Sequence, residues 1–459
     1  MGERTLEQQT EEVRSARRKI SPRNWLIIWI VGITGQLCWS VENSWFNTFV
    51  YDKIGPYPWI ITWMTAVSAI TMTVCSLLCG CWSDRVGRRK PFMIWGYIIW
   101  GAFTILFGAA QFVSGTVLAL GVFVIVADGL MSMMGAIGGD AGFGPWAIDI
   151  SDRSNRGTVG AATTTQPVIA TILCSLIGGW IIGAIDYFAF FLLMGVLVML
   201  LGVFNFFLVQ DAPDLRPNRD PKGFWHQFIQ VFNFRLMWKN RMLIAVWLIF
   251  IVYLTGFHMY FTHIMNYFIY TRGYSEGMAG VIFAVGLIVA IPTTLLAAKQ
   301  LNRFRFAETA SVTIGTNILG IVMLGLTSWI PESQPTLKLV CILVSVAFVG
   351  AGYMCTTQAL SVWAKNLYPD SQRGQLEGLR TFVCICVPMV VGPILANFII
   401  NTWGADVVIN GNAGKAASQW LYFGAAIVSA LAYIPIAYAR KLIKAGWSVE
   451  RPPEDVQGA

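Results

Sequence analysis

Long stretches without charged residues constrain the fold of this chain more than any other feature. Apart from Glu42, Asp128 and Asp140, the spans contain no Asp, Glu, Lys or Arg, and each has about the 20 residues or more that are needed to cross a bilayer. Only helices that bond their own backbone, or closed barrels, survive in lipid. The pattern predicts an all-α membrane protein with about twelve spans. They fall at 24–51, 58–82, 91–144 (two spans), 158–185, 187–209, 242–270, 277–298, 309–330, 339–364, 381–400 and 420–438.

The composition agrees with a membrane chain. Of the 459 residues, 56% are hydrophobic and 12% are charged, whereas a soluble domain carries about 25% charged residues. The net charge of +8 raises the question of nucleic-acid binding, but no basic face exists outside the loops between apolar segments. All nine cysteines lie in apolar segments and show no disulfide or zinc spacing. We therefore expect no nucleic-acid partner, no metal and no cofactor.

The basic residues predict the orientation in the membrane. With the N-terminus inside, 28 of the 32 Lys and Arg fall in the tails and the even-numbered connections. The outer loops hold only Lys53, Arg272, Lys338 and Lys415. Because cytoplasmic loops carry the excess of positive charge, both termini are predicted to be cytoplasmic. The charged stretch 1–23 predicts no cleavable signal peptide, and a cell membrane, plasma or inner, is the expected location.

A polar stretch at 210–241 divides the chain into two halves. We expect an N-terminal tail and six-helix bundle at 1–209, a cytoplasmic linker at 210–241, and a second six-helix bundle with its tail at 242–459. Within the linker, 224–238 alternates aromatic with polar residues, which is typical of a helix lying at the membrane surface.

A weak internal repeat supports two equivalent halves. Arg88 and Arg305 lie in loops after the second and eighth spans, and Arg156 and Arg373 lie in loops after the fourth and tenth. Each pair is separated by 217 residues. Equal spacing of two loop pairs indicates a duplicated six-helix unit, a feature of one large class of transporters.

The loop between the second and third spans carries the most specific motif. It reads Gly80-Cys-Trp-Ser-Asp84-Arg85-Val-Gly87-Arg88-Arg89-Lys90 and resembles the signature loop of the major facilitator superfamily. An acid at a helix end can pair with the basic cluster and with a neighbouring helix end. We expect a conformational latch that holds one arrangement of the two halves, formed by Asp84, Arg85, Arg88 and Arg89.

A narrower resemblance covers much of the first half. The stretch Gly35-Gln-Leu-Cys-Trp-Ser-Val-Glu-Asn-Ser44 resembles the first helix of plant sucrose/proton symporters and related animal sugar transporters, and Gly144-Pro145 followed by Asp149 also fits. The stretch Arg373-Gly-Gln-Leu-Glu-Gly378 is similar to the wider glycoside–cation symporter family, which includes melibiose permease. Residues 54–83 contain no acid where melibiose permease has carboxylates for sodium, which favours protons.

The resemblance implies a secondary active transporter and not an enzyme. It implies a monomer in the lipid bilayer that moves a sugar or glycoside together with a coupling proton, by rocking two bundles around a central site. One alternative is an efflux carrier that exchanges protons for amphipathic small molecules, although Ile177-Gly178-Gly179-Trp180 lacks the proline typical of such carriers. Another is a sugar receptor that does not transport, although no large soluble output domain is present.

Three isolated carboxylates are candidates for proton coupling. A charge at mid-membrane costs about 2.5–3.5 kcal/mol on insertion scales, so such residues tend to have functions. Protonation neutralises a carboxylate held out of water. The candidates are Glu42 on the first span and Asp128 and Asp140 on the fourth, and a structural ion pair is the alternative for each.

A polar stripe on the first span is a candidate for substrate binding. Gln36, Ser40, Asn43 and Asn47 recur at spacings of four, three and four, which places them on one helix face. Such a face should meet protein or a wet cavity, and amides supply the hydrogen bonds that a sugar requires. Helix–helix contact is the alternative. Trp39 beside the stripe is a candidate for stacking on a sugar ring.

The second half supplies further candidates for substrate binding. The seventh span carries Tyr253, Tyr260, His263 and Tyr267 on a similar stripe, with His258 nearby. Tyrosine offers a stacking face and a hydroxyl, and histidine could bond substrate or pass a proton. The substrate set is completed by Gln358 on the tenth span.

Overall fold

The structure, a computed structural model, describes residues 20–152, 155–213, 215–218, 222–232, 238, 240–301, 303, 305–369 and 373–447. In this part of the chain, twelve helices are long and apolar enough to cross a membrane, which confirms the predicted fold class. Parts of the predicted tails and linker, including 1–19, 219–221 and 448–459, lie outside the described residues.

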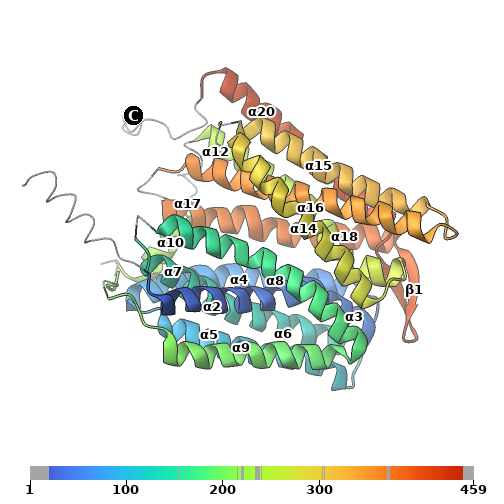
Figure 1. Ribbon diagram of the computed structural model, residues 1–459, viewed down its shortest axis with the longest axis horizontal. Coiled ribbons are helices and arrows are strands. Elements are labelled where there is room, and N and C mark those ends of the chain that lie inside the picture. The colour runs from blue at the N-terminus through green and yellow to red at the C-terminus, as the bar shows by residue number, and fades with distance from the viewer. Residues whose placement is uncertain are drawn as a thin grey trace, which may run out of the picture.

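The first half provides six spans, with the early elements of the chain grouped in the lower part of Figure 1. Their bounds are α2 (Pro22–Val41), η1 (Glu42–Phe46) and α3 (Asn47–Lys53) for the first span; α4 (Pro58–Val86); α5 (Lys90–Gly108) with η2 (Ala109–Phe112); α6 (Val117–Gly138), η3 (Gly139–Phe143) and α7 (Gly144–Asp149) for the fourth; α8 (Arg156–Ala184); and α9 (Tyr187–Leu208). A short α10 (Phe224–Ile229) and η4 (Gln230–Phe232) follow in the linker.

The second half provides the other six spans. Their bounds are α12 (Arg241–Phe261), α13 (Ile264–Asn266) and η5 (Tyr267–Thr271) for the seventh; α14 (Glu276–Leu301); α15 (Phe306–Leu326) with η6 (Thr327–Trp329); α16 (Pro335–Asn366); α17 (Arg373–Arg380), η8 (Thr381–Cys386) and α18 (Val387–Trp403) for the eleventh; and α19 (Gln419–Ala430) and α20 (Tyr433–Lys444) for the twelfth. Most helices run a few residues past the uncharged segments, because basic residues at their ends remain helical.

The structure adds two features that the charge pattern does not reveal. Four π-helical turns, η1, η3, η5 and η8, interrupt the first, fourth, seventh and eleventh spans. A π turn inserts a residue and therefore changes which face the following side chains occupy. Between the last two spans, β1 (Ala405–Ile409) and β2 (Asn412–Ala416) form an antiparallel hairpin, seen at the right edge of Figure 1.

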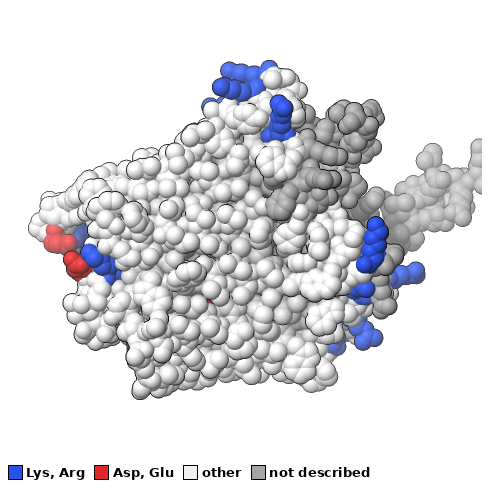
Figure 2. Space-filling model, turned by 180° about the vertical axis from the view of Figure 1, so that it is seen from behind, with Lys and Arg blue, Asp and Glu red and all other residues white. Residues whose placement is uncertain are grey.

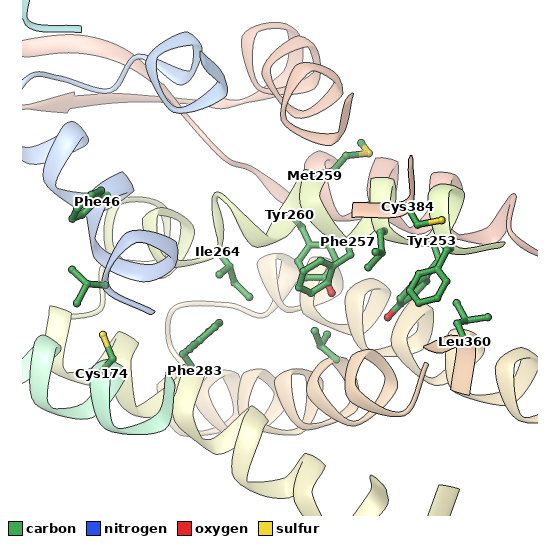
Figure 3. Packing of buried hydrophobic residues seen from close by; sticks show 14 of the residues in the cluster. Phe46, Cys174, Tyr253, Phe257, Met259, Tyr260, Ile264, Phe283, Leu360 and Cys384 are labelled. Carbon is green, nitrogen blue, oxygen red and sulfur yellow. The ribbon is translucent and has the colours of Figure 1, made fainter. Parts of the chain in front are cut away.

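Apolar packing within and between the halves builds one continuous core. In the first half α5 packs along α9, and in the second half α15 packs along α16. The halves meet where α8 contacts α14 and where α4 contacts α18. Figure 3 shows Tyr253, Phe257 and Tyr260 of α12 inside this core. Phe257 also stacks on Tyr353 at a centroid distance of 4.0 Å.

The molecular surface agrees with a position in a membrane. Figure 2 shows a wide uncharged face between two ends that carry the charged side chains. Large apolar side chains are exposed on the molecule, including Leu200, Leu295 and Val312, each more than half exposed. Lipid tails, which are as apolar as these side chains, are the surroundings that suit such a belt.

Candidate functional site

Two carboxyl groups from different spans meet in one cavity between the halves. Glu42 belongs to η1 of the first span and Asp128 to α6 of the fourth, and they lie close enough for their charges to interact. The cavity beside them has a volume of about 20 Å³, enough for a water molecule in this closed arrangement. Five spans contribute the lining, which consists of Glu42, Asn43, Asn47, Met64, Thr65, Ser68, Asp128, His258, Phe261, Thr262 and Met389.

Two serines orient the carboxyl group of Glu42. Ser68 Oγ donates to Glu42 Oε1 at 2.5 Å, and Ser132 Oγ donates to the same oxygen at 3.1 Å. The two serine oxygens are 2.7 Å apart. In contrast, Glu42 Oε2 and Asp128 Oδ1 are buried and find no hydrogen-bond partner among the described residues. A buried acceptor without a donor is costly, so these two oxygens are where a bound proton or ligand hydroxyl stabilises the site most.

The electrostatics of the cavity also favour proton binding. The described residues that line it include no Lys or Arg, and His258 is their one basic side chain. Neighbouring carboxylates repel each other, and a proton on one of them removes that repulsion. The pair can therefore exist in a protonated and a deprotonated form that differ by one charge, as a coupling site requires.

The π turn η1 separates the predicted polar stripe of the first span into two parts that face different surroundings. Ser40, before the turn, faces α8, where its Oγ lies 2.9 Å from Thr171 Oγ1 and donates to the carbonyl of Gln36. Asn43 and Asn47, within and after the turn, line the cavity. Asn47 Nδ2 also donates to the carbonyl of Thr262 in the second half at 2.8 Å. Only the later part of the stripe reaches the cavity.

Asp140, the third predicted coupling acid, lies apart from the pair. It belongs to the π turn η3, and its side chain is exposed. It is not among the residues that line the cavity. The structure thus groups two of the three predicted acids and places the third elsewhere.

The predicted residues of the seventh span lie mostly in the core of the second half. Tyr260 accepts a hydrogen bond from Asn317 Nδ2 at 3.3 Å, and Tyr267 OH lies 2.9 Å from Ser328 Oγ. His263 is fully buried, and neither ring nitrogen has a partner among the described residues. The residues of this span that do line the cavity are His258, five residues before His263, together with Phe261 and Thr262.

The other predicted substrate contacts also lie outside the cavity lining. Trp39 packs on Trp100 at a centroid distance of 5.0 Å, and Gln36 is half-buried. The side-chain oxygen of Gln358 is buried without a partner among the described residues.

The loop between the second and third spans is built around Arg89, which is only 5% exposed. Its guanidinium contacts Asp84 Oδ1 at 2.6 Å and Asp149 Oδ2, at the end of α7, at 2.9 Å. It also donates to Ser83 Oγ. Charge-assisted bonds from a planar fork fix geometry more strongly than a single point charge would. Arg89 thus ties the end of α4 to the end of α7, and so joins the second span to the fourth.

The same loop binds the start of the linker. Asp211 Oδ1 accepts the backbone N–H groups of Arg89 and Lys90 at 2.8 and 2.9 Å, at the beginning of α5. Gly87 adopts a φ of +68°, and a Cβ there would lie 2.8 Å from the nitrogen of Pro217. Glycine is required by both conformation and space.

The expected conformational latch stays a prediction, and the structure shows where its network lies. Its observed partners lie in the first half and the first residues of the linker, rather than across the two halves. Arg85 is half-buried and Arg88 is exposed. Through Asp211 the network also reaches the first residues of the linker that joins the halves.

Comparison with protein families identifies the fold's relatives. The model of the Major Facilitator Superfamily matches residues 28–393, most of the chain. The chain belongs to this superfamily. A comparison with curated proteins finds no match.

Solved structures of other major facilitator proteins share the fold at low identity. A single-residue variant of the nucleoside transporter NupG superposes with a TM-score of 0.69 at 14% identity, over 90% of this chain and 99% of that one. A D-xylose-proton symporter gives 0.60 at 13% identity, over 89% and 97%. A variant of the peptide transporter POT gives 0.67 at 12% identity, over 96% and 99%. At these identities the likeness establishes the fold alone.

Several residues of this major facilitator protein escaped the sequence analysis. Ser68, Ser132 and Asp211 are small or acidic side chains whose partners are distant in sequence. Asp149 enters the sequence prediction only through the resemblance to sucrose/proton symporters. An acid at a helix end is nevertheless a natural partner for a basic loop. No local pattern marks the serines.

Proposed function

We propose that this chain is a secondary active transporter that moves a sugar or glycoside together with a proton by alternating access, and that it has no enzymatic activity. Membership of the Major Facilitator Superfamily supports transport. The observation that carries the proton coupling is the Glu42–Asp128 pair, which lines a cavity between the halves and has two buried oxygens without a hydrogen-bond partner among the described residues. The pair lies beside a cavity that is lined by side chains from both bundles.

The substrate class is supported by the chemistry of the lining. Asn43, Asn47, Thr65 and His258 place amide, hydroxyl and imidazole groups in the cavity. Such groups both donate and accept, which suits a ligand rich in hydroxyls. The resemblance of the first helix to sucrose/proton symporters includes Glu42 and Asn43 themselves. One structural neighbour is named as a D-xylose-proton symporter and another as a nucleoside transporter, whose substrates also contain a sugar ring.

Alternating access is supported by where the halves are joined. Among the described residues, hydrogen bonds between the halves lie at the end of the molecule that carries the β1–β2 hairpin, here called the hairpin end. Asn47 donates to the carbonyl of Thr262, and Tyr270 OH donates to the carbonyl of Thr48 at 3.1 Å. Asn266 Nδ2 also donates to the carbonyl of Asn47. We infer a state closed at the hairpin end, whose partner state requires these bonds to break.

Reconstituted transport tests the proposed function. The full chain in liposomes should accumulate at least one member of a radiolabelled sugar and glycoside panel when a pH gradient is imposed. A protonophore should abolish that accumulation, since the proton gradient supplies the energy. Accumulation driven by sodium at zero pH gradient would overturn proton coupling. Proton-driven expulsion of amphipathic compounds, with no sugar moved, would instead favour the efflux carrier.

Thiol labelling tests the orientation, which we propose has both termini in the cytoplasm. Lys415→Cys, in the hairpin, should react with a membrane-impermeant maleimide applied outside intact cells. Arg303→Cys, at the other end of the second half, should react only after the membrane is permeabilised. Both positions are accessible in the structure, so burial does not explain a difference. The parent chain measures background from the native cysteines, and the reverse pattern would contradict the orientation.

A further inference from the structure

The β1–β2 hairpin is a self-contained element at one end of the second half. Its strands pair from Ala405 with Ala416 to Ile409 with Asn412. Asn410 and Gly411 form the turn with φ of +50° and +84°. Two such residues in sequence are typical of the tight turns that match the twist of a hairpin. The hairpin therefore has a defined shape of its own.

The hairpin is anchored to the second half at its base. Ser418 Oγ donates to the carbonyl of Trp403 at 2.6 Å, which closes the loop between the last two spans. Thr271 Oγ1, at the end of the seventh span, donates to the carbonyl of Ala417 at 2.7 Å. These bonds make the hairpin move with the second half.

The far side of the hairpin bonds to the first half. The N–H of Lys415 donates to the carbonyl of Pro56 at 3.0 Å, and Tyr51 OH donates to the carbonyl of Lys415 at 3.0 Å. Near the turn, Asn410 Nδ2 donates to the carbonyl of Asp52 at 2.8 Å. All of these first-half groups belong to residues 51–56, at the junction of the first and second spans. The hairpin thus bridges the two halves at the end where they are closed.

A small cluster of buried apolar side chains lies beside these bonds. Tyr51 and Ile61 of the first half and Ala416 of the hairpin are fully buried against one another. Tyr270 of the seventh span packs beside them, with its ring centroid 5.6 Å from that of Tyr51. The joint therefore combines a few uncharged hydrogen bonds with a modest apolar contact, and no ion pair between the halves is found at it among the described residues.

We propose that the β1–β2 hairpin is a strap by which the second half holds the hairpin end of the molecule closed over the first half. A joint of a few neutral hydrogen bonds is strong enough to bias one state and weak enough to open, since each such bond contributes little net free energy. The inference goes beyond the proposed function, because it concerns a gate and requires no particular substrate.

Gly414 offers a selective way to break the strap. A Cβ at this position would lie 2.3 Å from the carbonyl oxygen of Pro56, so Gly414→Val should push the hairpin off the first half. Gly414 is not among the residues with positive φ, so the strand itself can accept valine. Ala413→Val, at the neighbouring exposed position, is the matched control for bulk and β propensity.

The readout is the labelling rate of Ile61→Cys, a position that is fully buried in one cluster with Ala416 of the hairpin. In the purified full chain in detergent, Gly414→Val should raise the rate of reaction with a soluble maleimide about tenfold by shifting the population toward the open state. Tyr51→Phe, which deletes one bond without adding bulk, should raise it about threefold. Ala413→Val should leave it unchanged. Unchanged rates in both Gly414→Val and Tyr51→Phe would overturn the strap. Because the assay uses neither substrate nor gradient, its failure is distinct from a failure of the proposed transport.

Discussion

Glu42→Gln should lose uphill accumulation of substrate while retaining exchange of substrate across the membrane. Glutamine keeps the shape of the side chain and an oxygen that can accept from Ser68 and Ser132, so the cavity should survive. Glutamine cannot take up and release a proton, so the proton gradient can no longer drive accumulation of the substrate. Accumulation under a pH gradient and exchange under equal concentrations, measured in the same liposomes, separate the two activities.

The other two acids are the controls for this prediction. Asp128→Asn should resemble Glu42→Gln, since both carboxyl groups meet in one cavity. Asp140→Asn should keep accumulation, because Asp140 lies outside that cavity. Loss of accumulation in Asp140→Asn, with accumulation intact in Glu42→Gln, would assign the proton to Asp140 and contradict the pair.

Removing the guanidinium of Arg89 should destabilise the folded chain by about 3 kcal/mol, because breaking a buried ion pair leaves uncompensated charge. Asp84, Asp149 and Ser83 would all lose the same partner. The thermal unfolding midpoint of Arg89→Ala in detergent should fall clearly below that of the parent. Arg89→Lys should recover only part of the loss, because an ammonium group cannot bond two carboxylates in one plane.

Asp84→Asn calibrates this effect. The Asp84 side chain is 42% exposed, so its pair with Arg89 is screened and should contribute about 1 kcal/mol or less. Its fall in unfolding midpoint should therefore be much smaller than that of Arg89→Ala. Equal midpoints for Arg89→Ala and the parent would show that the network does not stabilise the ends of the spans that it joins.

The spans could be predicted from the sequence because lipid imposes a simple rule on the chain. A charge inside the hydrocarbon layer is costly, so charges mark the ends of spans, and the tenth span differs from its prediction by only a few residues at each end. The hairpin at 405–416 was missed, although Asn410-Gly411 after a valine-rich run is a recognised hairpin signal. A search for uncharged segments does not examine the loops between them.

Individual residues of the site could be predicted from the sequence, but their grouping in space could not. Glu42 and Asp128 stand out because each is a lone acid in an apolar segment, but nothing in the sequence tells that they face each other from two spans. The stripe from Gln36 to Asn47 assumed an unbroken α-helix, and the π turn at Glu42–Phe46 changes its phase. For Tyr260 the helical face was regular, yet periodicity does not tell whether a face meets the core or the cavity.

Proton movement caused by substrate tests the central claim most directly. The chain is reconstituted in liposomes that contain a pH-sensitive dye, and the transported sugar is added outside without any imposed gradient. The parent should acidify the interior as sugar enters, and the double variant Glu42→Gln/Asp128→Asn should exchange sugar with no change in internal pH. Sugar entry without acidification by the parent, or acidification by the double variant at the parent's rate, would contradict the assignment of coupling to this pair.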